Sequence, residues 1–336
     1  MQDATAMTDH SGLSDAPSES GMPDSAAQGK NTAPEKTARL DRDTLSEGWA
    51  EVGRLPRVLA TTKLGAKTDL GRVRDNNEDK FDFSEPDDMA VLATKGCFYA
   101  VADGMGGHSA GQVACELALK TMIQAYYADP SADTEGSLRR AVVEANALIF
   151  ETAQAVPDRH GMGTTLTGAV VREDRLTLVQ VGDSRAYLLR AGAITQVTED
   201  HSWVAEQVRL GTMTLADAQV SPFRNIITRA MGTAASVEPD VFTHELRVGD
   251  TLVLCSDGLS GHVEPPEILE TVQAHSPSGA AGALIEAANA RGGRDNITAV
   301  VLTVRALTPP AAAEPAADDP AGAVKEEKAS RWGRRK

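Results

Sequence analysis

The sequence predicts an α+β fold in which antiparallel sheets are covered by pairs of helices. Six short runs have the length and the β-branched, apolar composition of strands: 97–103, 165–171, 175–183, 185–192, 251–257 and 296–304. Two longer segments with helical spacing, 109–127 and 137–155, both fall between the first and the second of these runs. Paired helices argue against a doubly wound parallel sheet, in which helices and strands alternate singly.

Turn residues between the strands indicate how they are connected. Asp174, Gly182 and the pair Ala191–Gly192 stand where consecutive runs end and begin. Residues of these types favour tight connections between neighbouring strands. We therefore expect antiparallel hairpins at these positions.

The two long helices have side chains repeated at about one-turn spacing. In 109–127 the stripe is Val113, Leu117, Lys120 and Ile123, with Ser109 as a candidate N-cap. In 137–155 the stripe is Leu138, Val142, Ala145, Ile149 and Ala153. Shorter helices are expected at 202–210, 214–219, 265–274 and 280–291, with Thr214 as the cap of the second.

Composition divides the chain into three parts. Residues 1–60 are acidic and rich in Ser, Ala and Asp, and residues 307–336 are rich in Ala and Pro and end in the basic RWGRRK. Such segments bury too little apolar area to offset the entropy of ordering, so we expect both to be disordered tails. The folded domain is expected over residues 61–306.

The charge balance excludes several classes of partner. The 336 residues include 33 Lys and Arg against 48 Asp and Glu, a formal charge of −15. Residues 61–306 contain 33 of the acidic and 21 of the basic residues, so most of the excess belongs to the expected domain. An acidic surface does not favour nucleic acid or anionic membranes, and 4% aromatic residues are too few for base stacking.

The remaining composition indicates a location. The three cysteines are widely spaced and form neither a disulfide framework nor a zinc pattern, as in proteins of a reducing compartment. The sequence has no apolar run near the roughly 18 residues of a membrane span, and its first residues contain no apolar signal segment. We therefore expect a cytoplasmic protein.

Three of the expected strands end in the same way, with an aspartate beside a glycine. These aspartates are Asp103, Asp183 and Asp257, and further acidic residues stand at 78–79 and 295. A single Asp-Gly pair is most often a tight turn, but that explanation does not suit all five acidic positions together. Carboxylates gathered without Lys or Arg repel one another unless a cation lies between them. Mg²⁺ and Mn²⁺ prefer such oxygen ligands, so the pattern predicts a divalent metal site.

Six motifs follow one another along the chain: VRDNNED (73–79), ADGMGGH (102–108), GMGTTL (161–166), VGDSR (181–185), LCSDGL (254–259) and GRDNIT (293–298). The ordered set resembles the metal-dependent serine/threonine protein phosphatases of the protein phosphatase 2C type, the PPM family, in their bacterial form. The resemblance covers about residues 61–306. It implies a four-layer αββα sandwich of two antiparallel sheets flanked by helix pairs, with the metals at one edge.

The resemblance also implies which residues hold the metals. Asp103 would bridge two Mn²⁺ or Mg²⁺ ions, with the Gly104 carbonyl on the second ion. Asp257 and Asp295 would complete the ligands of the first ion.

Four other residues match the family at or beside this site. Glu78 and Asp79 match the acidic pair on the side of the second metal, and Asp183 matches a ligand of a third metal in bacterial relatives. Arg74 matches the arginine that binds the substrate phosphate, a role that suits the guanidinium fork.

The general acid is left open by the sequence. Eukaryotic relatives have a histidine two places after the bridging aspartate, where this chain has Met105. His108 lies five places after Asp103, as in bacterial relatives, and can either protonate the leaving alcohol or orient a water or a carboxylate. We expect His201 to pack or cap, and the three cysteines to be small core residues.

The resemblance implies a protein phosphatase that hydrolyses phosphoserine and phosphothreonine by a metal-activated bridging water. Its substrates would be phosphorylated proteins, its opponent a cognate bacterial Ser/Thr kinase, and its state a monomer. Residues 201–224 resemble the mobile flap beside the active site of bacterial members. Two alternatives remain: a non-catalytic pseudophosphatase that binds phosphoproteins as a scaffold, and a phosphatase acting on an anti-sigma antagonist.

Overall fold

The computed structural model describes residues 55–107 and 110–309. The greater part of both expected tails, together with Ser109 and His108, lies outside the described residues. Strand β1 begins at Leu59 and β12 ends at Thr308, each two residues beyond the expected domain limits. Within the described part of the chain, no helix is long and apolar enough to cross a membrane.

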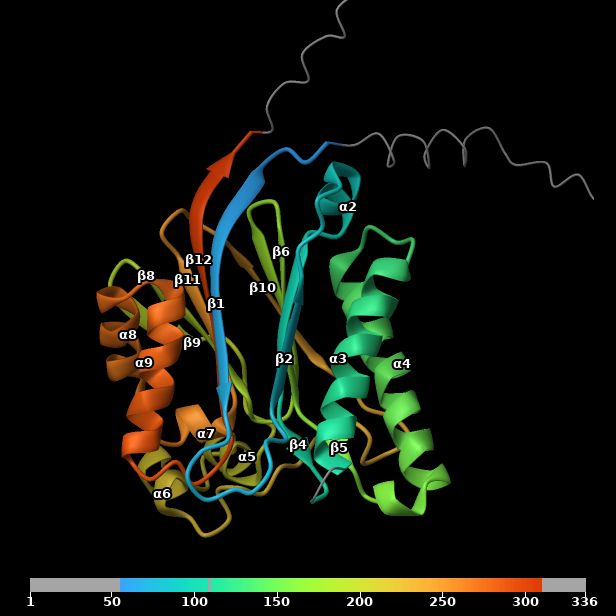
Figure 1. The fold of residues 1–336 in the computed structure, drawn as a ribbon, viewed down its shortest axis with the longest axis vertical. Helices are drawn as coiled ribbons and strands as arrows, with labels where there is room; N and C mark the ends of the chain where they lie inside the picture. Colours follow the sequence, from blue (N-terminus) through green and yellow to red (C-terminus); the bar gives the residue numbers. More distant parts are fainter. Residues whose placement is uncertain (1–54, 108–109, 310–336) are drawn as a thin grey trace, which may run out of the picture. The chain divides into compact units, whose positions relative to one another are not determined.

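Two five-stranded sheets form the centre of the domain (Figure 1). The first sheet has the order β1 (Leu59–Asp69), β12 (Ile297–Thr308), β11 (Thr251–Cys255), β8 (Arg185–Arg190) and β9 (Ala193–Gln196). The second has the order β10 (Asp240–Glu245), β7 (Arg175–Val181), β6 (Leu166–Arg172), β3 (Cys97–Ala102) and β2 (Lys80–Ser84). A small two-stranded sheet pairs β4 (Gly104–Met105) with β5 (Gly163–Thr164). All neighbouring strands are antiparallel.

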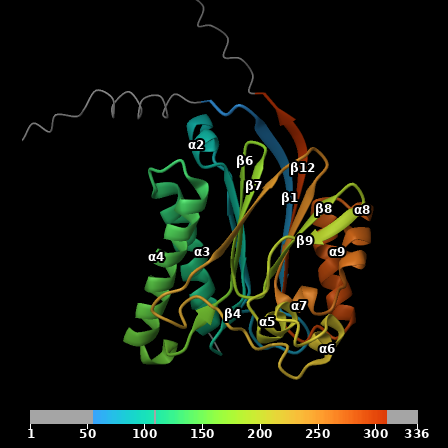
Figure 2. The same ribbon diagram turned by 180° about the vertical axis from the view of Figure 1, so that it is seen from behind.

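A pair of helices covers the outer face of each sheet. Helices α3 (Ala110–Ala128) and α4 (Thr134–Ala155) lie on the second sheet, and α8 (Pro265–Ala274) and α9 (Pro277–Ala290) lie on the first, as Figures 1 and 2 show from opposite sides. The shorter helices are α2 (Met89–Thr94), the 3₁₀ turn η1 (Pro157–Arg159), α5 (Trp203–Arg209), α6 (Leu215–Val220) and α7 (Asp257–Ser260). The α+β class and the αββα order of layers are confirmed.

Three apolar clusters fill the three spaces between the four layers. Strand β3 contributes to two of them, because Phe98 and Ala100 face the helices α3 and α4, whereas Tyr99 and Val101 face the first sheet. Alternate residues of β11 divide in the same way between the sheet interface and α8–α9. Strands covered on both faces read as continuous apolar runs, which is why the sequence makes them conspicuous.

The connection at Gly182 differs from the expectation. The turn after β6 and the turn at Ala191–Gly192 do join antiparallel neighbours. Gly182 instead carries the chain from β7 in the second sheet to β8 in the first, so the predicted hairpin there is wrong. The strands separate because their apolar faces are buried in different layers, and the carboxylate of Asp183 therefore lies at a crossing between the sheets.

The sequence did not predict the edge strands β1, β2, β9 and β10, the two-residue strands β4 and β5, or the short helices α2 and α7. Strands β1, β2 and β10 lie at sheet edges or alternate polar with apolar residues, and most of their side chains are only partly buried. Their assignment depends on pairing with distant strands, such as β1 with β12 along the whole of β1.

Candidate active site

Five aspartates lie at one edge of the two sheets. Asp103 follows β3 and Asp257 follows β11, whereas Asp79 precedes β2 and Asp295 precedes β12. Because neighbouring strands are antiparallel, the end of one and the beginning of the next meet at the same edge, at the bottom of Figure 1. Asp183, at the crossing from β7 to β8, joins them there.

Among the described residues, Asp295 is the member of this group that has an ion pair, with Arg74, and the other four aspartates have none. Burial, followed by the charges of Asp79, Asp257 and Asp183, raises the pKa of Asp103 well above its usual range. Burial likewise raises the pKa of Asp79 to about 7 and that of Asp183 to about 8. The pKa of Asp257 is raised by burial and by the charge of Asp295. The site is therefore a group of carboxylates that repel one another when all are ionised.

The donor atoms suit a divalent cation. Within the described residues, Asp79 Oδ1, Asp183 Oδ1 and Asp257 Oδ1 are buried without any hydrogen-bond partner. Buried carboxylate oxygens left unpaired are costly unless a cation binds them, and oxygen donors are what Mg²⁺ and Mn²⁺ prefer. In the same residues, no group of three or more His, Cys, Asp or Glu is placed to hold a metal ion by itself. Mg²⁺ commonly keeps several water molecules among its ligands, so a magnesium site does not need a protein atom at every ligand position.

Gly104 allows close packing beside Asp103. A Cβ atom at this position would lie 2.4 Å from the Gly111 carbonyl oxygen and 2.8 Å from that of Glu78. The first turn of α3 and the segment before β2 thus press directly against the backbone of residue 104. No residue with a side chain fits at position 104, which therefore requires glycine.

Arg74 lies at the exposed mouth of the site. Its Nη2 donates a hydrogen bond of 2.7 Å to Asp295 Oδ2, and its side chain is 54% exposed. The hydrogen bond to Asp295, together with the charges of Asp295, Asp103 and Glu78, raises the pKa of this guanidinium. Arg74 is therefore a permanent cation at the open side of the acidic group.

A buried hydroxyl links the loop of Asp103 to the turn of Asp183. Thr165 Oγ1 accepts a hydrogen bond of 2.9 Å from the Asp103 N–H and is 2.8 Å from Ser184 Oγ. Both Thr165 and Ser184 are fully buried. Gln180 Nε2 donates to the carbonyls of Gly182 and Ser184 at 3.0 and 2.7 Å, which fixes the same turn from behind.

His201 holds the other side of this turn. Its Nδ1 accepts a hydrogen bond of 3.0 Å from the Gly182 N–H, so the ring proton is on Nε2, 3.0 Å from Asp240 Oδ2. Arg229 Nη1 also donates to Asp240 Oδ1 at 2.8 Å. Burial lowers the pKa of His201, which favours the neutral ring. His201 is thus a buried packing residue, as expected, and it also supports the backbone next to Asp183.

Two supporting residues were not identified from the sequence. Ser256 Oγ donates to Asp79 Oδ2 at 2.6 Å, and Asn296 Oδ1 accepts from the Glu78 N–H at 2.8 Å. The Asn296 amide also donates to the carbonyls of Leu70 and Asn76, which joins the loop after β1 to the start of β12. Their only signal in the sequence is position: each is a polar residue next to an aspartate of a motif.

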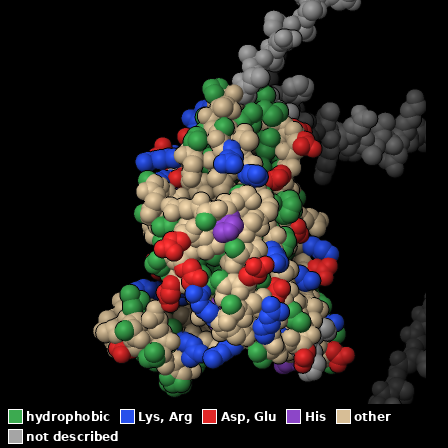
Figure 3. All heavy atoms as spheres, turned by 60° about the vertical axis from the view of Figure 1, so that its left-hand side comes forward, with side chains coloured by type: hydrophobic (Ala, Val, Ile, Leu, Met, Phe, Trp, Pro, Cys, Tyr) green, Lys and Arg blue, Asp and Glu red, His purple; other side chains and the backbone are tan. Residues whose placement is uncertain are grey.

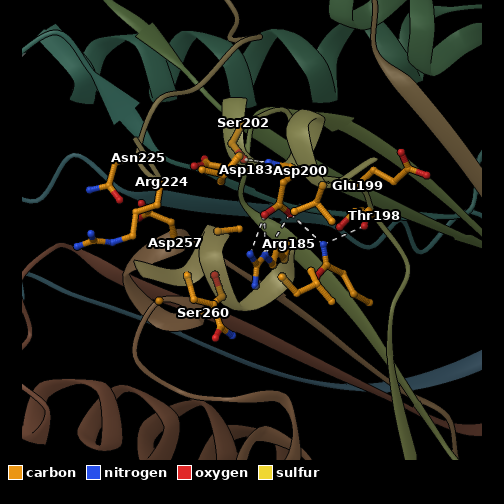
Figure 4. A pocket seen from close by; sticks show the side chains of 18 of the residues that line it. Asp183, Arg185, Thr198, Glu199, Asp200, Ser202, Arg224, Asn225, Asp257 and Ser260 are labelled. Atoms are coloured by element: carbon orange, nitrogen blue, oxygen red, sulfur yellow. Dashed lines mark hydrogen bonds and ion pairs between the residues drawn. The ribbon is translucent and has the colours of Figure 1, made fainter. Parts of the chain in front are cut away.

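The segment 201–224 forms a lobe beside the acidic group. It contains α5 and α6, and Thr214 caps α6 with a capping box, as predicted. A cavity of about 770 Å³ lies between this lobe, the residues around Asp183 and Asp257, and the start of α8. Figure 3 shows the hollow beside the lobe at the lower left, and Figure 4 shows Arg185 paired with Asp200 in its wall.

The cysteines do not contribute a nucleophile within the described residues. Cys115 and Cys255 are buried and Cys97 is partly buried. Burial raises the pKa of the Cys255 thiol to about 12 and that of Cys97 to about 11. Thiols held in this neutral form are inert core residues.

Comparison with known proteins places the chain in a family. Residues 67–297 match the family of protein phosphatase 2C. Serine/threonine protein phosphatase PstP of Mycobacterium tuberculosis is 40% identical over 250 residues, which are 74% of this chain and 46% of PstP. The chain thus spans about half the length of that curated relative. Serine/threonine phosphatase stp of Listeria monocytogenes is 40% identical over 247 residues, which are 72% of this chain and 95% of stp.

A solved structure agrees with the sequence relatives. The catalytic domain of serine/threonine protein phosphatase PstP, crystallised in complex with two manganese ions, has a TM-score of 0.64 and 38% identity to this chain. The match covers 74% of this chain and 100% of that one. The chain therefore belongs to the protein phosphatase 2C family, the metal-dependent serine/threonine protein phosphatases.

Proposed function

We propose that the chain hydrolyses phosphoserine and phosphothreonine in proteins with the help of divalent cations. The observation that carries the proposal is the group of buried aspartates with unpaired oxygens beside the exposed Arg74. Phosphate-monoester hydrolysis is among the slowest uncatalysed reactions, so it needs strong stabilisation of developing charge. Relatives named serine/threonine phosphatases support the same activity.

The acidic residues divide between two cation positions in this proposal. Asp103 would hold both cations, Asp257 and Asp295 would help to hold one, and the Gly104 carbonyl would help to hold the other. Glu78 and Asp79, on the segment before β2, belong to the side of Gly104. The manganese ions of the PstP structure support Mn²⁺, and the all-oxygen donor set suits Mg²⁺ equally. The unpaired Oδ1 of Asp183 supports a third position.

When bound, two divalent cations stabilise the attacking and leaving oxygens of an in-line displacement and lower the pKa of a water molecule. The residues of the chain hold the cations and orient the substrate phosphate. The aspartates, whose pKa values are raised in the unloaded protein, lose their protons when a cation binds. Arg74 exchanges Asp295 for the substrate phosphate, which its guanidinium binds with two nitrogens.

The non-catalytic alternative finds no support, because each acidic position of the motifs retains its carboxylate. The proposal includes a cytoplasmic monomer whose catalytic domain spans residues 61–306 and whose opponent is a Ser/Thr kinase. The role of His108 as the group that protonates the leaving alcohol stays a prediction, since this residue lies outside the described part of the chain.

The proposal is tested by hydrolysis of a phosphothreonine peptide with Mn²⁺ and with excess EDTA. Asp103→Asn and Asp257→Asn are expected to lower kcat by about 10³-fold or more, because each removes a ligand from the charge-stabilising site. Asp87→Asn is the matched control, since Asp87 is exposed beside α2 at the opposite end of the domain (Figure 1). Full activity in EDTA, or in both active-site variants, would contradict the proposal.

A further inference from the structure

Two loops meet backbone to backbone beside Arg74. The Arg72 N–H donates a hydrogen bond of 2.7 Å to the Gly293 carbonyl. A Cβ atom on Gly71 would lie 2.2 Å from the Asp295 carbonyl oxygen, and Gly71 and Gly293 have φ values of 82° and 48°. Both positions therefore require glycine. We call residues 70–75 and 291–295, which these contacts join, the basic rim.

The basic rim contains three exposed arginines, two of which have no ion pair within the described part of the chain. Arg72, Arg74 and Arg294 are all exposed. Arg74 is paired with Asp295, but among the described residues neither Arg72 nor Arg294 has a side-chain hydrogen bond or an ion pair. Val73, between two of the arginines, is 64% exposed.

The acidic neighbours offset only part of the positive charge of the rim, and Asp69 attracts Arg72 without a direct ion pair. Asp69 accepts hydrogen bonds from the Gly71 N–H and from Asn289 Nδ2, both at 3.0 Å. Arg291 is paired with Glu267 at 2.7 Å. Asp75 is the exposed carboxylate of the rim that has no ion pair among the described residues. Residues 70–75 and 291–295 themselves contain four arginines and two aspartates, and Arg72 and Arg294 are the two of these arginines that have no ion pair in the part of the chain that the structure describes.

This local sign is opposite to that of the domain, in which 33 acidic residues face 21 basic ones over residues 61–306. A domain of that charge repels an acidic segment of another protein. Exposed, unpaired arginines at the mouth reverse the repulsion locally, and the guanidinium group suits carboxylates and phosphates. The exposed Val73 can also contact the methylene groups of a glutamate side chain in the bound segment.

We propose that Arg72 and Arg294 bind acidic residues next to the phosphorylated residue, so that the site prefers phosphoserine and phosphothreonine in acidic segments. The inference rests on the proposed function and adds a substrate class to it. It concerns two arginines that are separate from Arg74, which binds the phosphate in that proposal.

The test compares kcat/KM for phosphothreonine peptides of equal length whose flanking residues are Glu, Gln or Lys. The unmodified protein is expected to prefer Glu over Lys by about tenfold, because Arg72 and Arg294 attract Glu and repel Lys; tenfold corresponds to about 1.4 kcal/mol. The double variant Arg72→Gln/Arg294→Gln should lose at least half of this preference on a logarithmic scale. Its hydrolysis of p-nitrophenyl phosphate, which has no flanking residues, should stay within twofold.

Arg175→Gln is the matched control, because Arg175 is an exposed arginine at the other end of β7, beyond reach of the site. It should leave the preference unchanged, and added salt should weaken the preference of the unmodified protein. An equal kcat/KM for all three peptides, or an unchanged preference in the active double variant, overturns the inference. If no peptide is hydrolysed with Mn²⁺, the proposed function itself fails and the inference fails with it.

Discussion

An aspartate lies at each end of strand β11, and the two differ in their partners: one is paired with an arginine and the other is not. Asp250, just before the strand, is 2% exposed and accepts hydrogen bonds of 2.8 and 2.6 Å from Arg190 Nε and Nη2. Asp257, just after the strand, has an unpaired Oδ1 and lies beside Asp103 and Asp295. The carboxylate at one end of β11 is neutralised by an arginine, whereas the carboxylate at the other end is not.

The neighbouring strand β8 shows that the difference does not result from a shortage of arginine. Arg190, at one end of β8, pairs with Asp250. Arg185, at the other end, lies close to the acidic group but pairs with Asp200 at 2.7 Å (Figure 4). The charge of Arg185 is thus used to neutralise Asp200, and Arg185 forms no ion pair with Asp257. The ion pair of Asp250 stabilises the fold, whereas the unpaired oxygen of Asp257 lowers the stability of the folded protein, as is common at functional sites.

The largest effect expected from this comparison is on stability. Asp250→Asn should lower the free energy of unfolding by about 3 kcal/mol or more, because it leaves the Arg190 guanidinium without its buried partner. Asp257→Asn in the metal-free protein should have no such cost, since it removes one of several charges that repel one another. Urea denaturation in EDTA measures both. An equal loss of unfolding free energy in the two variants would contradict the idea that Asp250 stabilises the fold and Asp257 does not.

The pH dependence of stability sharpens the comparison. The folded-state pKa values of about 7 for Asp79 and about 8 for Asp183 lie above those of an unfolded aspartate, so the folded metal-free protein binds more protons near neutrality. Its stability should be greatest at about pH 5 and should fall toward pH 7 by about 2 to 3 kcal/mol per pH unit, which is about 1.4 kcal/mol for each of the two protons. Denaturation in EDTA from pH 5 to 8 measures the slope, which excess Mn²⁺ should abolish. A stability that rises over this range would contradict the assignment.

The smallest effect is expected from the supporting hydroxyls. Thr165→Val leaves the buried Asp103 N–H without its acceptor and Ser184 without its partner, so Mn²⁺ should bind about tenfold more weakly. Thr177→Val is the matched control, because Thr177 is also a nearly buried strand residue. Calorimetric titration with Mn²⁺ measures the affinity directly. Identical affinities in the two variants would show that Thr165 does not position Asp103.

The positions of several site residues could be predicted from the local sequence, because a buried strand fixes the place of the residue that follows it. An aspartate after an apolar run sits at the end of a buried strand whatever the rest of the fold does, so Asp103 and Asp257 were correctly expected at a sheet edge. The stripe of α4 from Leu138 to Ala153 is likewise buried as predicted, because a single apolar face settles the orientation of a helix.

The long-range arrangement could not be predicted in this way. In α3 the most buried residues include Ala114, Ala118 and Met122, whereas Val113 and Leu117 of the predicted stripe are only partly buried. Small residues face inward there because α3 is covered by both α4 and the second sheet. The support that Ser256 gives Asp79 joins residues 177 positions apart in sequence, and no local pattern reports such a contact.

The sequence by itself therefore determined the class of fold, the central strands of the two sheets, the longer helices, and the set of acidic residues that the family motifs contain. Only the tertiary structure decided that Gly182 crosses between sheets and that Arg190 neutralises Asp250 while Arg185 leaves Asp257 unpaired. It also placed Arg72 and Arg294 on one rim. Hydrophobic periodicity is a local property and can be read along the chain, but the partner of each charge is set by which distant strands and loops meet.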